Sequence, residues 1–380
     1  MARIRPVQYD AAVVGLGGMG AAALAHLARR GVRAVGIDRF ARDHALGASS
    51  GETRVIRMAY FEDPAYVPLL QRAYALWAQL EEQTGQTLLD LTGILLTGER
   101  ERDAIAGTLR AAREYGLPLE LLDADELRRR FPGATPRASE IGLLERRGGI
   151  VFPEAGVRAH LRAAQDAGAE LRFETTVRWW EAGRRAIALR LNDDTAIETA
   201  RLILAPGMWS DELLGDLGLP LRVQRNVQVW FEPATRAFDR GTFPAFLVDR
   251  ADLPAALYGF PAIGGALKAA LHAYGEAASA TTLDRDVHDA DVAAVRTALE
   301  PWMPGASDRY LRAKVCPYTL TPDANFVLGP HPRVAGVVIA CGFSGHGYKF
   351  CPVVGEIAAD LALDGATRFE IGFMSPTRFA

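Results

Sequence analysis

The sequence predicts a mixed α/β fold, in which a largely parallel sheet is built from discontinuous segments and an antiparallel-sheet domain is inserted between them. An apolar run at 7–15 passes directly into a glycine-rich turn and an alanine-rich helix, a succession typical of a buried parallel strand and its crossover helix. A second apolar run, 334–341, also ends in a glycine-rich turn. Residues 221–313 show strand and helix patterns without that succession, which indicates a separate antiparallel and helical region.

The composition is that of a globular chain with a large core. Of 380 residues, 49% are hydrophobic and 23% are charged, which excludes a fibre, a disordered tail protein and a disulfide-stapled miniature. This length favours two intertwined domains. The net charge of −3 offers no excess of positive charge to a nucleic acid or an anionic membrane, so we expect neither partner.

The cellular compartment is predicted from two further features. The uncharged stretch 11–28 is too rich in glycine and alanine for a membrane helix. The three cysteines, Cys316, Cys341 and Cys351, have neither C-x-x-C pairing nor metal-ligand spacing. We therefore expect a cytoplasmic protein with no disulfide framework and no metal site.

The turn after the first strand indicates a class of ligand. Gly15, Gly17 and Gly20 form a G-x-G-x-x-G motif at the start of a helix, and a second strand, 32–37, leads to Asp38. In this order the glycines allow close approach of a pyrophosphate to the helix N-terminus, and the acid accepts a hydrogen bond from a ribose hydroxyl. The segment is therefore predicted to be a Rossmann-type dinucleotide-binding unit.

The other elements follow from periodicity and from capping residues. We predict helices at 64–83, 124–130, 153–167 and 287–299, a closing helix that begins near Pro352, and strands at 94–97, 170–177, 186–191, 196–205, 227–231 and 334–341.

Lysine is rare in this chain. Only three of the 43 basic residues are lysines: Lys268, Lys314 and Lys349. A sequence that uses arginine for almost all positive charge has little reason to keep a lysine on a solvated face. These three positions are candidate sites for a compact ammonium group, with chance survival as the alternative for each.

Six motifs in order resemble the family of monomeric sarcosine oxidase and N-methyltryptophan oxidase, which are FAD-dependent amine oxidases. They cover nearly the whole chain and are 15–20, 51–57, 258–261, Leu267-Lys268 with His272, Cys316 with Tyr318-Thr319, and 342–350. The resemblance implies a monomer with FAD attached through Cys316. It also implies oxidation of a secondary (N-methyl) amino acid by oxygen to an imine, then an aldehyde and an amine, with release of hydrogen peroxide.

The resemblance also implies roles for particular residues. Lys268 would activate oxygen, Arg54 would face the flavin, Tyr258 and His272 would line the active site, and Arg57 and Lys349 would hold the substrate carboxylate. The implied cofactor contacts are Gly15, Gly17, Gly20, Asp38, Arg39, Ser50, Thr53, Val177, Gly207, Cys316, Gly342, Gly345, Gly347 and Lys349. The FAD-binding domain would comprise 1–85, 148–219 and 318–380, and the substrate domain 86–147 and 220–317.

One departure and several alternatives stay open. Ser49 and Ser50 stand where the best-known members carry a histidine pair, and Glu52 replaces an aspartate, which leaves unassisted flavin attachment in question. Lys314 would share a strand face with Cys316 and could favour its thiolate, or could be a solvated lysine. The alternative functions are a pipecolate, proline-type or fructosyl-amino-acid oxidase, a flavoprotein dehydrogenase, and a flavin-binding subunit without turnover.

Overall fold

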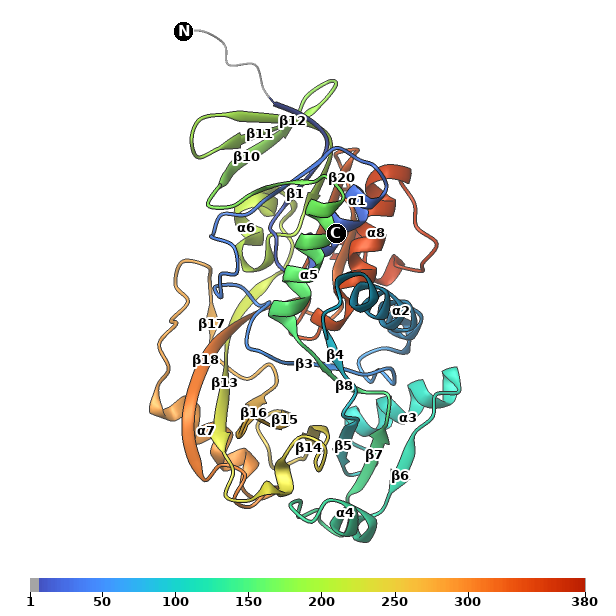
Figure 1. Cartoon of the computed structure of the whole chain (residues 1–380), viewed down its shortest axis with the longest axis vertical. Helices are drawn as coiled ribbons and strands as arrows, with labels where there is room; N and C mark the ends of the chain where they lie inside the picture. Colours follow the sequence, from blue (N-terminus) through green and yellow to red (C-terminus); the bar gives the residue numbers. More distant parts are fainter. Residues whose placement is uncertain (1–6, 380) are drawn as a thin grey trace.

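The computed structural model describes residues 7–379, which form two sheet-based lobes stacked along the long axis of the molecule (Figure 1). The first six residues of the predicted FAD-binding domain lie outside the described residues. The fold is mixed α/β, as the sequence predicts.

The first lobe contains an eight-stranded sheet whose centre is parallel. β1 pairs in parallel with β2 and with β12, while β9 and β20 extend the parallel part on either side. β10, β11 and β19 are added in antiparallel pairings. The strands are β1 (Val7–Val14), β2 (Ala34–Ile37), β9 (Glu170–Arg172), β10 (Val177–Ala182), β11 (Ile187–Leu191), β12 (Ala196–Leu204), β19 (Val327–Pro330) and β20 (Val337–Cys341).

The predicted single strand at 170–177 is wrong. β9 ends at Arg172, and the chain enters β10 only at Val177. Between them Glu174 takes a left-handed backbone conformation, with φ of 52°, and the amide of Thr175 donates to the carbonyl of Asp38. A left-handed residue cannot continue a strand, so the segment turns across the end of β2.

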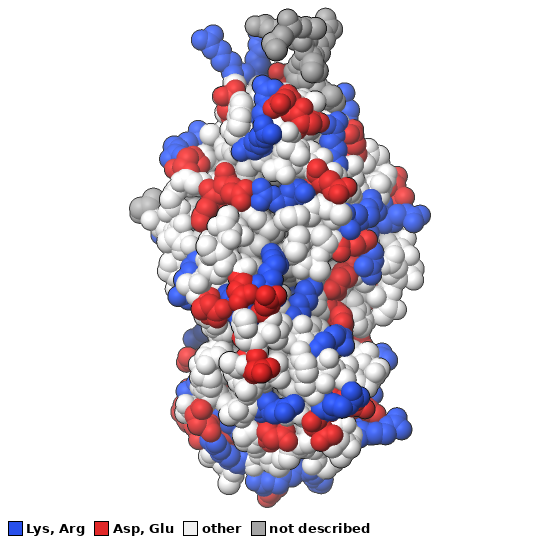
Figure 2. Space-filling model, turned by 90° about the vertical axis from the view of Figure 1, so that its left-hand side faces the viewer, with Lys and Arg blue, Asp and Glu red and all other residues white. Residues whose placement is uncertain are grey.

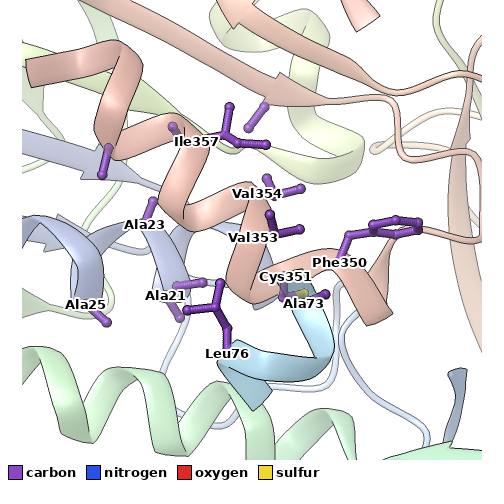
Figure 3. Close-up of a cluster of buried hydrophobic side chains, with 14 of the residues drawn as sticks. Ala21, Ala23, Ala25, Ala73, Leu76, Phe350, Cys351, Val353, Val354 and Ile357 are labelled. Carbon is purple, nitrogen blue, oxygen red and sulfur yellow. The ribbon is translucent and has the colours of Figure 1, made fainter. Parts of the chain in front are cut away.

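Helices rich in small side chains cover this sheet. α1 (Gly18–Arg29) packs between α5 (Pro153–Asp166) and α8 (Cys351–Asp364), and α2 (Val67–Thr84) packs against α8. Figure 3 shows Ala21 and Ala23 of α1 beside α8, whose Val353, Val354 and Ile357 belong to the same buried cluster. A Cβ at Gly355 of α8 would overlap Ala22 of α1. Small residues at this contact let the two helix backbones approach closely. The two glycine-rich turns that precede α1 and α8 are thereby held near each other.

The second lobe contains a nine-stranded sheet that is antiparallel except where β14 pairs with β5. Its strands are β5 (Ile94–Gly98), β6 (Glu120–Leu122), β7 (Ile141–Glu145), β13 (Arg222–Glu232), β14 (Ala245–Asp249), β15 (Leu257–Ile263), β16 (Ala266–Leu271), β17 (Ala277–Ala278) and β18 (Arg309–Leu320), and its helices are α3 (Asp103–Tyr115), α4 (Ala124–Arg130) and α7 (Asp289–Leu299). The strand predicted at 227–231 is part of β13, and its residues are buried on both faces there.

A small sheet lies between the lobes. β3 (Arg54–Ile56) and β4 (Leu89–Asp90) pair with opposite edges of β8 (Gly149–Val151). β13 and β18 reach from this region down the second lobe (Figure 1). β18 runs without a break through the predicted domain boundary at residue 317, so the domain limits remain a prediction.

Acidic and basic side chains are interspersed on the face shown in Figure 2, with no region of one sign dominating it. Within residues 7–379, no helix has the length and apolar character needed to cross a bilayer.

A short helix, α6 (Ser210–Leu214), follows the turn at the end of β12.

Candidate active site

One large cavity is lined by residues from both lobes. All of the predicted site residues line it except Ser50, Thr53 and Lys268, which lie behind its wall; those that line it are Gly15, Gly17, Gly20, Asp38, Arg39, Arg54, Arg57, Val177, Gly207, Tyr258, His272, Cys316, Gly342, Gly345, Gly347 and Lys349.

The first glycine-rich turn leaves a space that side chains would fill. Gly15 has φ of 89°, and a Cβ at Gly20 would overlap the carbonyl of Gly15. The carboxylate of Asp38 accepts the amide of Leu16 at 2.7 Å and the amide of Phe40 at 2.9 Å, which fixes the turn at the end of β2. The bare backbone and the N-terminus of α1 beside it fit the pyrophosphate of a dinucleotide.

The second glycine-rich turn closes the opposite wall. A Cβ at Gly345 would overlap the ring of Tyr318, and Gly345 has φ of 77°. The turn leads into α8, and Gly347, Tyr348 and Lys349 also line the cavity. The missing side chain at Gly345 lets the ring of Tyr318 lie directly against the backbone of this turn.

Arg57 carries a buried positive charge that is already paired. Its guanidinium donates to the carboxylate of Glu62 and to the carbonyl of Ala59, the latter at 2.8 Å. The guanidinium carbon lies 4.3 Å from the ring centre of Tyr60 and 4.2 Å from that of Phe61. Burial raises the pKa of Glu62, but its interactions with Arg57, His346 and Lys349 together outweigh the effect of burial and bring that pKa to about 2.

Lys349 places a second positive charge on the same aromatic ring. Its Nζ lies 5.1 Å from the ring centre of Tyr60 and donates to the carbonyl of His346 at 2.7 Å. Burial, reinforced by Arg57, lowers the pKa of Lys349 to about 7. Two cations in one cavity can together hold a carboxylate: an arginine can donate two parallel hydrogen bonds to it, and a lysine acts as a point charge.

Cys316 faces the cavity beside polar and aromatic groups. One guanidinium nitrogen of Arg54 lies 3.4 Å from its Sγ. The hydroxyls of Tyr258 and Tyr318 are 3.3 Å apart, and the ring centres of His272 and Tyr318 are 5.7 Å apart. Burial raises the pKa of Tyr258 and lowers that of His272 to about 4, so both side chains are neutral at physiological pH.

Lys268 is buried but outside the cavity lining. Its Nζ donates to the carbonyls of Gly51 and Thr53 at 2.6 and 2.8 Å and to the hydroxyl of Thr53 at 3.2 Å. It also lies 4.9 Å from the ring centre of Phe260. Burial lowers the pKa of Lys268 well below its usual value. Lysines 268 and 349 are only 2% and 5% exposed, so neither amino group lies in bulk water.

Three features of the site were not predicted from the sequence. Glu62 pairs with Arg57. Glu154, at the start of α5, accepts the amides of Gly51 and Glu52 and so fixes the loop before β3. Glu212 accepts both nitrogens of Arg39 at 3.1 and 2.6 Å. Only Glu62 had a local signal, an acid five residues after the arginine.

A glycine cradle at the carboxyl ends of parallel strands, open to a cavity with buried cations, defines the class of dinucleotide-dependent α/β enzymes. The family model described as FAD dependent oxidoreductase matches residues 10–361. The chain therefore belongs to the family of FAD-dependent oxidoreductases.

Relatives of known name extend over the whole chain. It is 42% identical to monomeric sarcosine oxidase of Streptomyces avermitilis, with 98% of each chain covered. It is 33% identical to N-methyl-L-tryptophan oxidase of Yersinia pestis, with 98% of this chain and all of the relative covered. The solved structure of L-proline dehydrogenase from P. horikoshii superposes with a TM-score of 0.86 at 23% identity, covering 98% of each chain, a likeness of fold.

Proposed function

We propose that the protein oxidises secondary, N-methyl amino acids with FAD and oxygen, as the names of its sarcosine and N-methyltryptophan oxidase relatives suggest. The observation that carries the proposal is the pair of buried cations, Arg57 and Lys349, in the same cavity as the glycine cradle and Cys316. Bare FAD binding requires neither cation.

The residues present fit FAD. The turn 15–20 would hold its pyrophosphate, Asp38 and Arg39 its adenosine half, and the turn 342–347 its ring system. Cys316 would form a thioether with the ring, beside Arg54. When bound, FAD accepts a hydride equivalent from the carbon next to the amine nitrogen and passes the electrons to oxygen, which becomes hydrogen peroxide.

The chain's own residues orient the substrate. Arg57 and Lys349 would hold its carboxylate, which places the amine end toward Tyr258 and His272. Because His272 is neutral, it can accept a hydrogen bond from the amine without repelling a positive charge. Lys268, held by the 51–53 backbone behind the cavity, would stabilise negative charge as oxygen is reduced.

The protein is further proposed to act as a cytoplasmic monomer. Oxygen is the proposed electron acceptor because Lys268 is retained and buried, whereas a dehydrogenase that passes electrons to a protein has no need of it. Pipecolate, proline-type and fructosyl-amino-acid substrates carry the same carboxylate and differ in the side-chain pocket.

The test is peroxide release by the purified, yellow protein from a panel of amines. The panel contains sarcosine, N-methyl amino acids, pipecolate, proline and fructosyl-valine. The controls are the matching amines that lack a carboxylate. Turnover of at least one N-methyl amino acid, with its decarboxylated partner inactive, is expected. No peroxide with any carboxylated secondary amine would favour a dehydrogenase or a flavin-binding subunit without turnover. Preferential turnover of pipecolate or proline would redefine the substrate class.

A further inference from the structure

Lys314 lies on the same face of β18 as Cys316. Side chains two residues apart on a strand point to the same side, and the alternation continues to Tyr318, which lines the cavity. Lys314 stands opposite Gln228 of β13, and Cys316 stands opposite Asn226. Lys314 does not line the cavity itself, but its side chain is drawn inward to a specific partner.

That partner is Ser50. The Nζ of Lys314 donates to the hydroxyl of Ser50 at 2.7 Å, across 264 residues of sequence. Ser50 is 3% exposed, so its hydroxyl has little water to bond instead. A hydrogen bond from a charged donor to a buried hydroxyl is stronger than a neutral one, and it fixes the serine in place.

Ser50 in turn holds Arg54. The carbonyl of Ser50 accepts one guanidinium nitrogen of Arg54, which also bonds the carbonyl of Ala48 at 2.9 Å. The same nitrogen lies 3.4 Å from the Sγ of Cys316. Lys314 therefore bonds the hydroxyl of Ser50, and the carbonyl of the same residue bonds Arg54, which reaches the sulfur.

The charges around Lys314 act in both directions. Burial and the positive charge of Arg54 lower the pKa of Lys314, whereas negative charge at Glu154 and Cys316 raises it. A protonated Lys314 and an anionic Cys316 thus stabilise each other. The thiolate is the nucleophilic form of cysteine, and cations nearby favour it.

We propose that Lys314 is a positioning residue for covalent attachment of the flavin: through Ser50 it holds Arg54 against Cys316, and it adds a second positive charge near the sulfur. This inference rests on the proposed function, since it requires FAD beside Cys316. It also answers how attachment can proceed where Ser49 and Ser50 replace a histidine pair.

The chemistry of attachment balances with oxygen as the final oxidant. A bond forms between Sγ and the 8α methyl carbon of the flavin, while the S–H bond and one C–H bond of that methyl break. The two hydrogens lost reduce the flavin, as two electrons and two protons, and oxygen then removes both as hydrogen peroxide. Positive charge from Arg54 and Lys314 favours departure of the thiol proton.

The test measures attachment directly. Full-length protein is produced in flavin-limited cells and mixed with FAD and oxygen. The flavin that remains in an acid-precipitated pellet is then followed with time. Total bound flavin is measured before precipitation, so that binding and attachment are separated. Four variants are compared with the wild type: Lys314→Met, Lys314→Arg, Ser50→Ala, and Lys314→Met with Ser50→Ala.

We expect Lys314→Met to bind FAD but to attach it at least about tenfold more slowly, the effect of losing one charged hydrogen bond. Lys314→Arg should recover to within about threefold of the wild-type rate because it retains the charge. Ser50→Ala should be slowed less than Lys314→Met, because it loses the link but keeps the charge of Lys314, and the double variant should be no slower than Lys314→Met, since the link is then already lost. Arg312→Met is the matched control: it removes a cation of β18 that pairs with Glu52 rather than Ser50, and attachment should be unchanged.

Each other outcome has a definite meaning. Attachment by Lys314→Met at the wild-type rate, or equal slowing by Lys314→Arg, would overturn the role of Lys314 and leave the proposed function intact. A wild-type protein that binds FAD but keeps none in the pellet would overturn the covalent link together with this inference. Failure to bind FAD at all would overturn the proposed function itself. If Lys314→Met unfolds at a clearly lower temperature than the wild type, the attachment rate of Ser50→Ala is used in its place to test the role of the Lys314–Ser50 hydrogen bond, because that variant removes only one oxygen atom.

Discussion

The guanidinium of Arg57 is paired with the carboxylate of Glu62 inside the cavity where the substrate carboxylate is expected. Arg57 is 3% exposed, and a buried cation without a partner is strongly destabilising. Glu62 therefore serves as the counter-ion of Arg57 in the free protein, and a carboxylate bound at Arg57 would compete with it.

Replacement of Glu62 by glutamine tests this competition. Arg57 would lose its counter-ion, so we expect the free protein to lose about 3 kcal/mol of stability, as when a buried ion pair is broken. A carboxylate ligand such as propionate should restore the pair, and so bind about tenfold more tightly than to the wild type. Thermal unfolding and titration of the flavin absorbance measure the two effects. Glu212→Gln is the control, because Glu212 also lines the cavity but pairs with Arg39. If Glu62→Gln bound propionate no more tightly than the wild type does, Glu62 would not compete with a carboxylate for Arg57.

Binding of an amine-free carboxylate should depend on pH through Lys349. Its pKa in the free protein is about 7, and a bound carboxylate raises it. Affinity is then full below pH 7 and falls as the pH rises toward the higher pKa of the complex. Propionate dissociation constants from pH 6 to 9.5 measure this, and Lys349→Met should give a flat profile. His272 and His346, with pKa values of about 4 and 3, stay neutral over this range. A wild-type profile as flat as that of the variant would remove Lys349 from the carboxylate site.

Replacement of Cys316 by serine should leave the flavin extractable. After acid precipitation the yellow colour is expected in the supernatant, whereas in the wild type it stays in the pellet. Cys341→Ala provides the comparison, because Cys341 is buried in the core of the first lobe and burial raises its pKa to about 12. Colour retained in the pellet of Cys316→Ser would place the link elsewhere.

Lys268→Met should separate the two half-reactions. Loss of a fixed cation is expected to slow reoxidation by oxygen about 100-fold, while anaerobic reduction by substrate changes little. Stopped-flow absorbance follows each step. The carbonyls of Gly51 and Thr53 also lose their donor, so the free energy of unfolding should fall by about 2 kcal/mol. Equal slowing of both half-reactions would indicate that Lys268 only supports the loop.

Local patterns predicted the parts of the fold that neighbouring residues decide. The glycine-rich turns, α1 and α8 follow directly from spacing and small side chains, because a tight turn and a helix start depend on a few consecutive residues. The break after Arg172 escaped prediction, since an alternating strand pattern continues through it, whereas the chain turns where the amides of Glu174 and Thr175 donate to the carbonyls of Phe40 and Asp38.

The sequence by itself determined which residues are exceptional. Three lysines beside forty arginines, and glycines with the spacing G-x-G-x-x-G at the end of an apolar run, can be identified without coordinates. Tertiary structure alone decided their surroundings: Lys349 faces the cavity, Lys268 lies behind Thr53, and Lys314 reaches Ser50. The physical reason is that Lys268 and Lys314 are more than 200 residues from Thr53 and Ser50 in the sequence, and only the packing of the loop before β3 against β16 and β18 brings these groups within a few ångströms.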